Sequence, residues 1–423
     1  MTTEQILSLT EKEPTPLYVF DLGELSRRIA YLKSVLPEKT ELCYAVKANT
    51  FIIQKAAELV DYLEICSPGE YRICEALSVP HEKYVISGVN KQAGFIEELV
   101  AEKSPIAVFT AESKNQFFLL RDAARERKLP VLLRLTSGTQ FGLDEADLFE
   151  VIRDYKDDPY IDICGIQYFS GTQKNSLKKL KRELDYVDRI IRDLKEQFSF
   201  ETRKLEYGTG FPVSYFEGES FDEDTFMKEF SALLSGMEFK GTITLEIGRS
   251  IAASCGTYLT RVVDTKINCG ERYAIVDGGM NQIVYYGQFM AMKHPKIRLL
   301  PAPGKTEDPP EKDSSESSFE TDDSSENDAG TSDWNICGSL CTINDFLVKK
   351  YPFPDLNPGD ILAFESAGAY CPTEGIALFL SRELPGVYLL HETSAFHKVR
   401  EQIPTERFNS PVPIERTVSH KKE

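Results

Sequence analysis

Short apolar runs alternate with amphipathic stretches along about the first 250 residues of the chain. In LSRRIAYLKSVL (25–36), Leu25, Ile29 and Leu32 recur at helical spacing, which predicts a helix with one buried face. Asp21, three residues before Glu24, is typical of a helix N-terminal cap and predicts a helix that begins near residue 22. The apolar runs predict eight strands: CYAVKAN (43–49), YLEICS (62–67), KYVISG (83–88), IAVFTA (106–111), VLLRLT (131–136), ICGIQYF (163–169), KLEYGTG (204–210) and TITLEIG (242–248).

Eight strands that alternate with helices are typical of a parallel (β/α)8 barrel, the TIM barrel of the α/β class. We expect this barrel to occupy residues 22–253. Beyond residue 254 the apolar runs are separated by turns, and the pattern predicts a second, β-rich and barrel-like domain. We expect residues 254–423 to form it together with residues 1–21. Its clearest runs are YLTRVVDTKI (258–267), RYAIVDGG (272–279) and DILAFESAGAY (360–370).

One acidic segment interrupts the second domain. Residues 305–333 contain eleven acidic and two basic residues, which supply half of the net charge of −18. The segment is rich in Ser, Asp and Glu, and Phe319 is its one large apolar side chain, so it cannot bury enough surface to offset the entropy of ordering. We predict a disordered, solvated insertion over residues 303–333, with an acidic docking segment as the alternative.

The composition argues against several kinds of partner. A net charge of −18 disfavours binding to nucleic acid, and no run approaches the ~18 apolar residues that cross a membrane. The N-terminus has no basic head followed by an apolar stretch, so we expect a cytoplasmic protein without a secretory signal. The nine cysteines lack zinc-type spacing and are expected to be free thiols. The five histidines form no metal-ligand set, and we expect no metal.

Residues that carry chemistry follow the predicted strands. In a (β/α)8 barrel, functional residues lie at the C-terminal ends of the strands. Lys47 lies at the end of the first strand, and Glu64 and Arg134 lie in two others. Each has a structural explanation when taken alone, because a lysine can reach solvent and Arg134 with Glu64 can form an ordinary buried ion pair. Three polar turns follow later strands: SGTQ (170–173), GTG (208–210) and EIGR (246–249).

Taken together, these residues predict a single site. Glycine-containing turns can bind a phosphate through backbone N–H groups, although such turns are often only turns. A desolvated lysine beside a phosphate pocket suggests Schiff-base chemistry. Pyridoxal phosphate fits every part, because it offers an aldehyde to the lysine, a phosphate to the turns and a ring nitrogen to a carboxylate.

Six motifs, in this order along the chain, resemble those of the fold type III (alanine racemase-fold) pyridoxal-phosphate decarboxylases. That family includes the diaminopimelate, ornithine and arginine decarboxylases. The resemblance covers nearly the whole chain outside the acidic segment, and the lysine strand is a specific match. The motifs are TPLYVFD (15–21), YAVKAN (44–49), LEYGTGFP (205–212), EIGRSIAASCG (246–256), CGSLCTINDFL (337–347) and AGAY (367–370).

The resemblance implies a role for each matching residue. Lys47 would hold the cofactor as a Schiff base, and Glu246 would pair with its protonated ring nitrogen. Arg134, steadied by Glu64, would lie near the ring hydroxyl. The phosphate would be bound by Gly208, Thr209, Gly210, Gly248 and Arg249, with hydroxyl groups added by Thr172 and Tyr370.

The resemblance also implies a homodimer with composite active sites. Cys341 would enter the site from the partner subunit and return a proton to the substrate after carbon dioxide is lost. A buried structural thiol is the alternative for Cys341. The substrate would be a small amino acid or a conjugate of one, and the residues near it would be Tyr285, Thr342 and Asp345.

The chain departs from the family pattern around the cofactor. Ile247 replaces the proline of a Glu-Pro-Gly-Arg motif. Gln167 and Phe169 occupy the two positions of a His-x-His motif in which one histidine stacks on the cofactor ring. Phe169 can still stack through its aromatic face, but it cannot donate a proton, so the reaction cannot depend on that histidine.

The residues expected near the substrate differ from the family pattern more than those around the cofactor. Diaminopimelate decarboxylases carry an arginine for the distal carboxylate where this chain has Tyr285. Ornithine and diaminopimelate decarboxylases carry an acid for the distal amine where this chain has Thr342. Losing a buried charge partner is costly, so we expect a neutral or bulkier amino-acid conjugate rather than free diaminopimelate, lysine or ornithine. Relatives that act on siderophore or peptide-antibiotic intermediates resemble the chain in YFSGTQ (168–173) and LCT (340–342).

Two other functions are compatible with this fold. An amino-acid racemase would need a second acid or base and would lack the Cys–Asp motif, so GSLCTINDF (338–346) favours decarboxylation. A non-catalytic regulatory homologue would often lack the lysine or the cysteine, and this chain has both.

Overall fold

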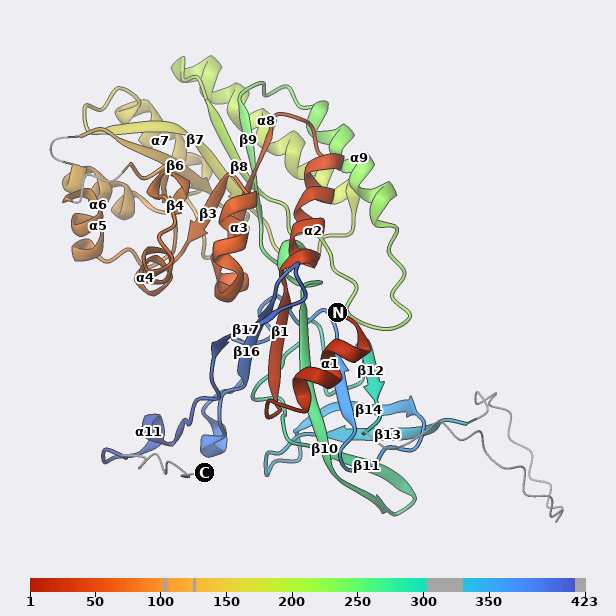
Figure 1. Cartoon of the computed structure of the whole chain (residues 1–423). Coiled ribbons are helices and arrows are strands. Elements are labelled where there is room, and N and C mark those ends of the chain that lie inside the picture. The colour runs from red at the N-terminus through yellow and green to blue at the C-terminus, as the bar shows by residue number, and fades with distance from the viewer. Residues whose placement is uncertain (102–104, 125–126, 303–329, 415–423) are drawn as a thin grey trace, which may run out of the picture.

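The computed structural model describes residues 1–101, 105–124, 127–302 and 330–414. The described chain forms two parts, a barrel wrapped by helices and a sheet domain, which Figure 1 shows above and below one another. Residues 303–329 of the predicted acidic insertion lie outside the described residues. Ser332 and Asp333, which we had included in that insertion, begin a strand of the sheet domain.

Eight parallel strands close into a barrel, because the first of them, β2, pairs with both β3 and β9. Each strand corresponds to one of the apolar runs, so the prediction of a (β/α)8 barrel is confirmed. The strands are β2 (Thr40–Ala45), β3 (Tyr62–Ile65), β4 (Tyr84–Ile86), β5 (Val108–Ala111), β6 (Leu129–Leu135), β7 (Ile161–Phe169), β8 (Lys204–Gly208) and β9 (Thr242–Ile247).

Helices cover the outside of the barrel (Figure 1). The helix before β2 begins directly after Asp21, whose carboxylate accepts a hydrogen bond from the Glu24 N–H at 2.9 Å, as the predicted cap requires. Its Leu25, Ile29 and Leu32 are buried, which confirms the predicted apolar face. The helical elements of the barrel are α2 (Leu22–Val35), η1 (Val46–Ala48), η2 (Thr50–Ile52), α3 (Ile53–Leu59), α4 (Pro68–Ala76), η3 (His81–Lys83), α5 (Ala93–Ala101), α6 (Lys114–Ala124), α7 (Glu145–Tyr155), α8 (Leu177–Phe198), α9 (Glu223–Ser235) and α10 (Arg249–Ala252).

Side chains alternate across each barrel strand, so every second residue points into the barrel. On β8, Leu205 and Tyr207 belong to the main hydrophobic core outside the strands. Lys204, Glu206 and Gly208 alternate with them and therefore face into the barrel. Inward-facing Cys43, Val85, Val108, Leu132 and Cys164 form a separate apolar cluster. Three glutamates from other strands, Glu64 on β3, Glu206 on β8 and Glu246 on β9, bring carboxylate oxygens within 4.8 Å of one another.

The sheet domain combines the N-terminus with the second half of the chain. Strand β1 pairs antiparallel with β10 and parallel with β16, so residues 17–21 lie in the middle of the sheet. The order along the sheet is β14-β13-β11-β10-β1-β16-β17, and β15 pairs with β10 and β12. A second, β-rich domain is therefore confirmed. Its elements are α1 (Thr3–Thr10), β1 (Leu17–Asp21), β10 (Gly256–Asn268), β11 (Glu271–Val276), β12 (Ile297–Leu300), β13 (Ser332–Cys337), β14 (Phe346–Phe353), β15 (Ile361–Phe364), η4 (Phe379–Ser381), β16 (Gly386–Leu390), β17 (Phe396–Arg400) and α11 (Glu406–Asn409).

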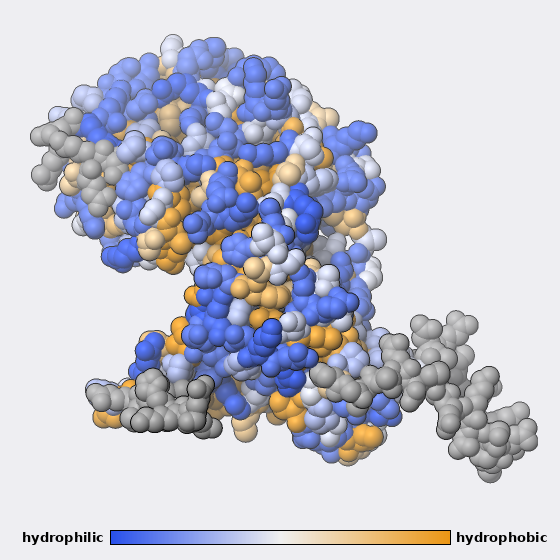
Figure 2. All heavy atoms as spheres, viewed as in Figure 1, coloured by the Kyte–Doolittle hydropathy of each residue, from blue (hydrophilic) through white to orange (hydrophobic). Residues whose placement is uncertain are grey.

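Figure 2 shows a predominantly hydrophilic surface on the barrel, with hydrophobic patches on its lower part and on the sheet domain below it. Within the described ranges, no helix has the length and apolar character needed to span a bilayer. All nine cysteines are described, and each is a free thiol, as predicted.

Candidate active site

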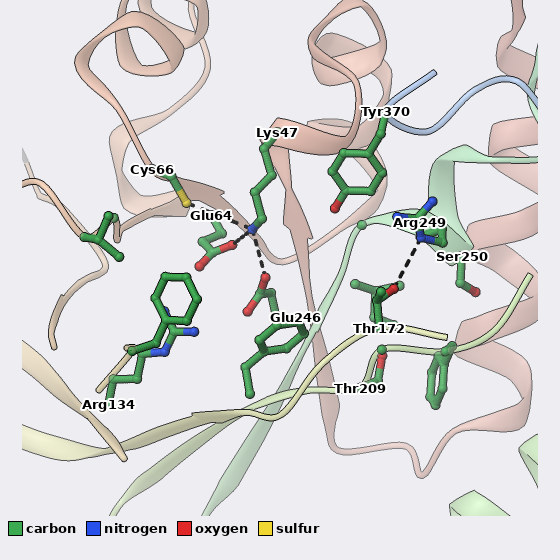
Figure 3. Close-up of a pocket in the computed structure, with 18 of the residues that line it drawn as sticks. Lys47, Glu64, Cys66, Arg134, Thr172, Thr209, Glu246, Arg249, Ser250 and Tyr370 are labelled. Carbon is green, nitrogen blue, oxygen red and sulfur yellow. Dashed lines mark hydrogen bonds and ion pairs between the residues drawn. The ribbon is translucent and has the colours of Figure 1, made fainter. Parts of the chain in front are cut away.

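A cavity of about 540 Å³ opens at the C-terminal ends of the barrel strands. Tyr370 of the sheet domain forms one wall, and Tyr286 and Glu374 lie at its border. Figure 3 shows Lys47 and Glu246 in the middle of this cavity, with Arg134 on one side and Arg249 on the other. The volume suits a small-molecule ligand.

Lys47 lies in η1, directly after β2, and extends into the cavity (Figure 3). Its amine forms ion pairs with Glu64 and, at 3.0 Å, with Glu246 Oε1, and Cys66 Sγ is 4.0 Å away. The lysine side chain remains 38% exposed, toward the open cavity. Burial acts to lower the pKa of Lys47, but the charges of Glu246 and Glu64 raise it well above its ordinary value.

Three glutamates lie near the amine of Lys47. Glu64, Glu206 and Glu246 each place a carboxylate oxygen within 4.8 Å of the others, and the Lys47 ammonium is the nearby positive charge. Burial, followed by the charge of Glu64, raises the pKa of Glu246. For Glu64, burial acts in the same direction, but the Lys47 ammonium outweighs it and lowers the pKa of the carboxyl.

The ion-pair partner of Arg134 differs from the one expected from the sequence. We expected Glu64 to steady it, but the Arg134 guanidinium lies 3.1 Å from Glu112 Oε1 in a buried ion pair. Glu112 directly follows β5, the neighbour of β6, so the two side chains emerge side by side, whereas Glu64 is taken by Lys47. The Arg134 guanidinium also lies 4.8 Å from the Phe141 ring centre. We did not predict Glu112 as a site residue. It directly follows the run IAVFTA, and functional residues are expected at the C-terminal ends of barrel strands.

The opposite end of the cavity is built from closely packed backbone. Gly210 has a positive φ of +58°, and a Cβ there would lie 2.1 Å from the Gly171 carbonyl oxygen. A Cβ on Gly248 would lie 2.8 Å from the Tyr370 hydroxyl. Gly208 lies behind this wall, against the ring of Phe169. These glycines allow the turns after β7, β8 and β9 to approach one another.

Polar groups at this end are arranged for an anion. The Thr209 hydroxyl is buried at the cavity wall and has no hydrogen-bond partner among the described residues. The Arg249 guanidinium donates to Thr172 at 3.3 Å and to the Tyr215 hydroxyl at 2.9 Å, and it lies 4.6 Å from the ring centre of Tyr370. A phosphate would supply the acceptor that Thr209 lacks and would face the Arg249 charge. The residues therefore fit the phosphate of pyridoxal phosphate at one end and its aldehyde at Lys47.

The residues predicted for the substrate take other positions. Tyr285 is buried away from the cavity, where its hydroxyl donates to the Glu365 carbonyl at 2.6 Å, and its neighbour Tyr286 lines the cavity instead. Asp345 is buried, and its carboxylate accepts hydrogen bonds from the backbone N–H groups of Met280 and Leu340 at 2.8 and 2.7 Å. It ties two loops together in this chain.

Cys341 and Thr342 lie on an exposed loop outside the cavity wall of their own chain. The exposed Cys341 differs from the buried thiol that a structural role would need. The cavity brings together most of the predicted cofactor residues, namely Lys47, Glu64, Arg134, Phe169, Thr172, Thr209, Gly210, Glu246, Gly248, Arg249 and Tyr370.

Comparison with known proteins agrees with this geometry. The family model of the pyridoxal-dependent decarboxylases, described by their C-terminal sheet domain, matches residues 17–368. The chain is 25% identical to L-glutamyl-[BtrI acyl-carrier protein] decarboxylase of Niallia circulans, over 94% of each chain. It is 27% identical to 2-[(L-alanin-3-ylcarbamoyl)methyl]-2-hydroxybutanedioate decarboxylase of Staphylococcus aureus, over 90% of this chain and 96% of that one.

Among solved structures, the chain resembles diaminopimelate decarboxylase from Helicobacter pylori complexed with L-lysine, with a TM-score of 0.78 and 24% identity. The match covers 94% of this chain and 97% of that one, and it supports the fold. The family match spans both domains, and its range includes the predicted lysine strand, phosphate turns and Cys–Asp segment. The chain therefore belongs to the pyridoxal-dependent decarboxylase family and is a pyridoxal phosphate-dependent decarboxylase.

Proposed function

We propose that this enzyme removes the α-carboxylate of an amino acid that is part of a conjugate, with Lys47 as the cofactor lysine and Cys341 of the partner subunit as the proton donor. One observation carries the proposal. The Lys47 amine lies 3.0 Å from Glu246 in a cavity that ends in the unpartnered Thr209 hydroxyl and the Arg249 guanidinium.

We assign each part of the cofactor to a residue of the cavity. Lys47 would bind its aldehyde carbon, Glu246 its ring nitrogen, and the Phe169 ring one face of its ring. Thr172, Thr209, Arg249 and Tyr370, with the backbone of Gly210 and Gly248, would bind its phosphate, whereas Gly208 lies behind the cavity wall. When bound, pyridoxal phosphate supplies an aldehyde that links to amines and a ring that withdraws electrons from the α-carbon.

The chain's own side chains balance charge and transfer protons during the reaction. Glu64 and Glu246 hold the Lys47 amine between them, and Glu246, whose pKa is raised, is the better acceptor for a proton from Lys47 when the amine must be neutral. The reaction breaks the bond between the α-carbon and its carboxylate, releases carbon dioxide and adds one proton at the α-carbon. The Cys341 thiol is chemically able to donate that proton.

Exposed residues support a shared active site. Cys341 lies outside the cavity of its own chain, so a second subunit is needed to bring it to a substrate. Its neighbour Ile343 is 89% exposed, and Phe289 and Met290, close in sequence to cavity residue Tyr286, are 73% and 66% exposed. Large exposed apolar side chains of this kind are typical of protein interfaces. A homodimer with composite sites would bury them.

The charges of the cavity favour a conjugate. Arg134 is paired with Glu112, and we assign the Arg249 charge to the cofactor phosphate. The described part of the cavity wall therefore offers no free arginine for a distal carboxylate. The relatives named above act on a carrier-bound glutamyl group and on a carbamoyl-linked alanine. We propose an amino acid whose far end is an amide or ester-like linkage.

The first experiment tests Lys47. The purified enzyme loaded with pyridoxal phosphate is expected to show a near-visible absorption band that borohydride removes, and Lys47→Ala is expected to lack it. Lys91→Ala is the matched control, because this lysine lies near the cavity and donates to the Gly88 carbonyl. A band that survives in Lys47→Ala would reject the assignment of the cofactor lysine.

The second experiment tests the substrate. Carbon dioxide release is measured with diaminopimelate, lysine, ornithine and a series of amide and ester conjugates of diamino and dicarboxylic amino acids. We expect a higher kcat/KM for a conjugate than for any free diamino acid. A preference for diaminopimelate or ornithine would overturn the substrate proposal and leave the assignment of a decarboxylase intact.

A further inference from the structure

Glu206 is a buried carboxyl group that the proposed reaction does not use. It lies inside the barrel on β8, opposite Gln167 in the register of β7, and only 2% of Glu206 and 1% of Gln167 are exposed. The Gln167 side-chain N–H donates to Glu206 Oε1 at 2.8 Å. One hydrogen bond therefore joins the amide and the carboxyl group in the barrel interior.

The amide of Gln167 leaves one atom unexplained. Its carbonyl oxygen Oε1 is buried and has no hydrogen-bond partner among the described residues. An unpaired buried carbonyl is costly, and an ionised carboxylate beside it can only accept hydrogen bonds. A protonated carboxyl can donate one, and an amide and a carboxylic acid can then form two hydrogen bonds with each other.

We propose that Glu206 is a neutral carboxylic acid that donates its proton to Gln167 Oε1, and that by staying neutral it acts as a positioning residue for Glu246. The first part concerns the chain alone. The second part rests on the proposed role of Glu246 toward the cofactor ring nitrogen.

The charges around Glu206 favour the neutral form. Glu64 on β3 and Glu246 on β9 place carboxylate oxygens within 4.8 Å, and Lys47 after β2 is a single ammonium that forms ion pairs with both. A third negative charge would have no partner in this cluster. Consistent with this, burial, and then the charges of Glu64 and Glu246, raise the pKa of Glu206 to about 8.

The other groups that face Glu206 do not supply a counter-charge. Cys43 on β2 is fully buried, and burial raises the pKa of its thiol well above the usual value, so it is neutral. Thr244 on β9 is uncharged, and its hydroxyl donates to Glu41. Lys204, two residues before Glu206 on β8, directs its amine to the Tyr62 hydroxyl at 3.3 Å. The Gln167 amide is therefore the direct partner of Glu206.

A neutral Glu206 has a consequence for Glu246. If Glu206 were ionised, its charge would raise the proton affinity of Glu246, whose carboxylate lies within 4.8 Å of it. A proton shared between Glu246 and the cofactor ring would then move toward Glu246. Keeping Glu206 neutral leaves the negative charge on Glu246, where it can hold the ring nitrogen in its protonated form.

Infrared difference spectroscopy of the cofactor-free protein tests the first part. We expect a protonated-carboxyl stretching band with a component that disappears as the pH rises through about 8, and this component is lost in Glu206→Gln and remains in Glu246→Gln. The absence of such a band would overturn the proposal. The same holds if the carboxyl cluster binds Mg²⁺ or Mn²⁺ in a thermal-shift titration and Glu206→Gln abolishes that shift, because the cluster would then hold a cation instead of a proton.

Cofactor affinity tests the second part with two variants. Glu206→Gln imitates the neutral acid and can keep both hydrogen bonds to Gln167, so its Kd for pyridoxal phosphate is expected to stay within about twofold of the wild type at pH 7. Glu206→Leu removes both bonds and is expected to weaken binding about tenfold or more. Above pH 8 only the wild type should lose affinity. A Gln variant as weak as the Leu variant would show that an ionised carboxylate is required. An infrared band without cofactor binding would reject the proposed function and leave neutral Glu206 intact.

Discussion

The Arg134 guanidinium lies 3.1 Å from the Glu112 carboxylate, and this buried ion pair joins the ends of β5 and β6 at the cavity wall. The two side chains are only 13% and 5% exposed. Removing one partner would leave the other charge buried without compensation. We therefore expect Glu112→Gln and Arg134→Met each to lower the free energy of unfolding by about 3–5 kcal/mol.

Chemical denaturation of the two single variants and the double variant checks this pair. The double variant should recover much of the lost stability, because it removes both charges together. If the two single effects simply add in the double variant, the pair does not stabilise the barrel as a unit.

Glu246 is expected to be essential for turnover. Glu246→Gln keeps the size of the side chain but removes the negative charge proposed to face the cofactor ring nitrogen, so kcat should fall on the order of 100-fold or more. The measurement is carbon dioxide release with saturating cofactor. Glu41→Gln is the matched control, because Glu41 accepts from Thr244 further down the same barrel. An unchanged kcat in Glu246→Gln would remove Glu246 from the mechanism.

Stability should depend on pH through Glu206. The native carboxyl keeps its proton up to a pKa of about 8, because of burial and then the charges of Glu64 and Glu246, whereas the unfolded carboxyl releases its proton near the ordinary value of about 4.3. Between these values the native state binds more protons, so this contribution to stability is present at low pH and is lost as the pH rises toward 8. Glu206→Gln lacks this titration. Its stability relative to the wild type should rise by about 1.4 kcal/mol per pH unit across that window.

Urea denaturation at several pH values between 5 and 9 checks this slope. The difference between the two proteins should level off above about pH 8. A difference that does not change with pH would mean that Glu206 titrates alike in both states.

Lys174 lies behind the cavity wall, at the end of the cavity where we place the cofactor phosphate. Its side chain is 2% exposed, pairs with Glu183 at 2.9 Å and donates to the Gly208 carbonyl at 3.1 Å. Lys174→Met would leave Glu183 uncompensated, so we expect a loss of about 3–5 kcal/mol in unfolding free energy. It should also weaken pyridoxal phosphate binding, because the turn after β8 loses its support.

Lys181→Met is the control for Lys174. Lys181 forms an exposed pair with Asp185 at 2.7 Å, and its loss should cost less than about 1 kcal/mol and leave cofactor binding unchanged. Equal effects of the two substitutions would show that burial of Lys174 is irrelevant.

The shared active site predicts complementation between two inactive variants. Lys47→Ala and Cys341→Ala are each expected to be nearly inactive alone. Mixed and reassembled in equal amounts, they should form heterodimers in which one of two sites has both residues, giving about a quarter of the wild-type activity. Failure to recover activity, with heterodimers shown to form, would place Lys47 and Cys341 in the same subunit's site or remove the cysteine from the reaction.

Local pattern was sufficient for most of the architecture. Each of the eight apolar runs became a barrel strand, and the helix after Asp21 began where its cap predicted. These features depend on the side-chain periods of strands and helices, which are properties of short segments. The same reasoning placed Lys47, Glu246 and the glycine turns at one end of the barrel, because all parallel strands end on the same side.

The partners of these residues required the tertiary structure. Arg134 lies beside Glu112 and not Glu64, and Tyr286 lines the cavity where Tyr285 was expected. Residues near the same barrel end compete for partners, and a shift of one position along the chain changes which side chain reaches a cavity. The spacing of residues in the sequence gives neither the outcome of this competition nor the side chain that reaches the cavity.

The order of the elements, the family motifs and most of the charged groups at the strand ends could be predicted from the sequence alone, whereas Glu112 was recognised only in the structure, beside Arg134. The tertiary structure decided which charges meet, as with Lys47 between Glu64 and Glu246, and which polar atoms remain unpaired, as with Thr209 and Gln167. The physical reason is that element formation depends on local periodicity. Ion pairing and protonation depend on distances and burial that arise only when strands distant in sequence close into one barrel.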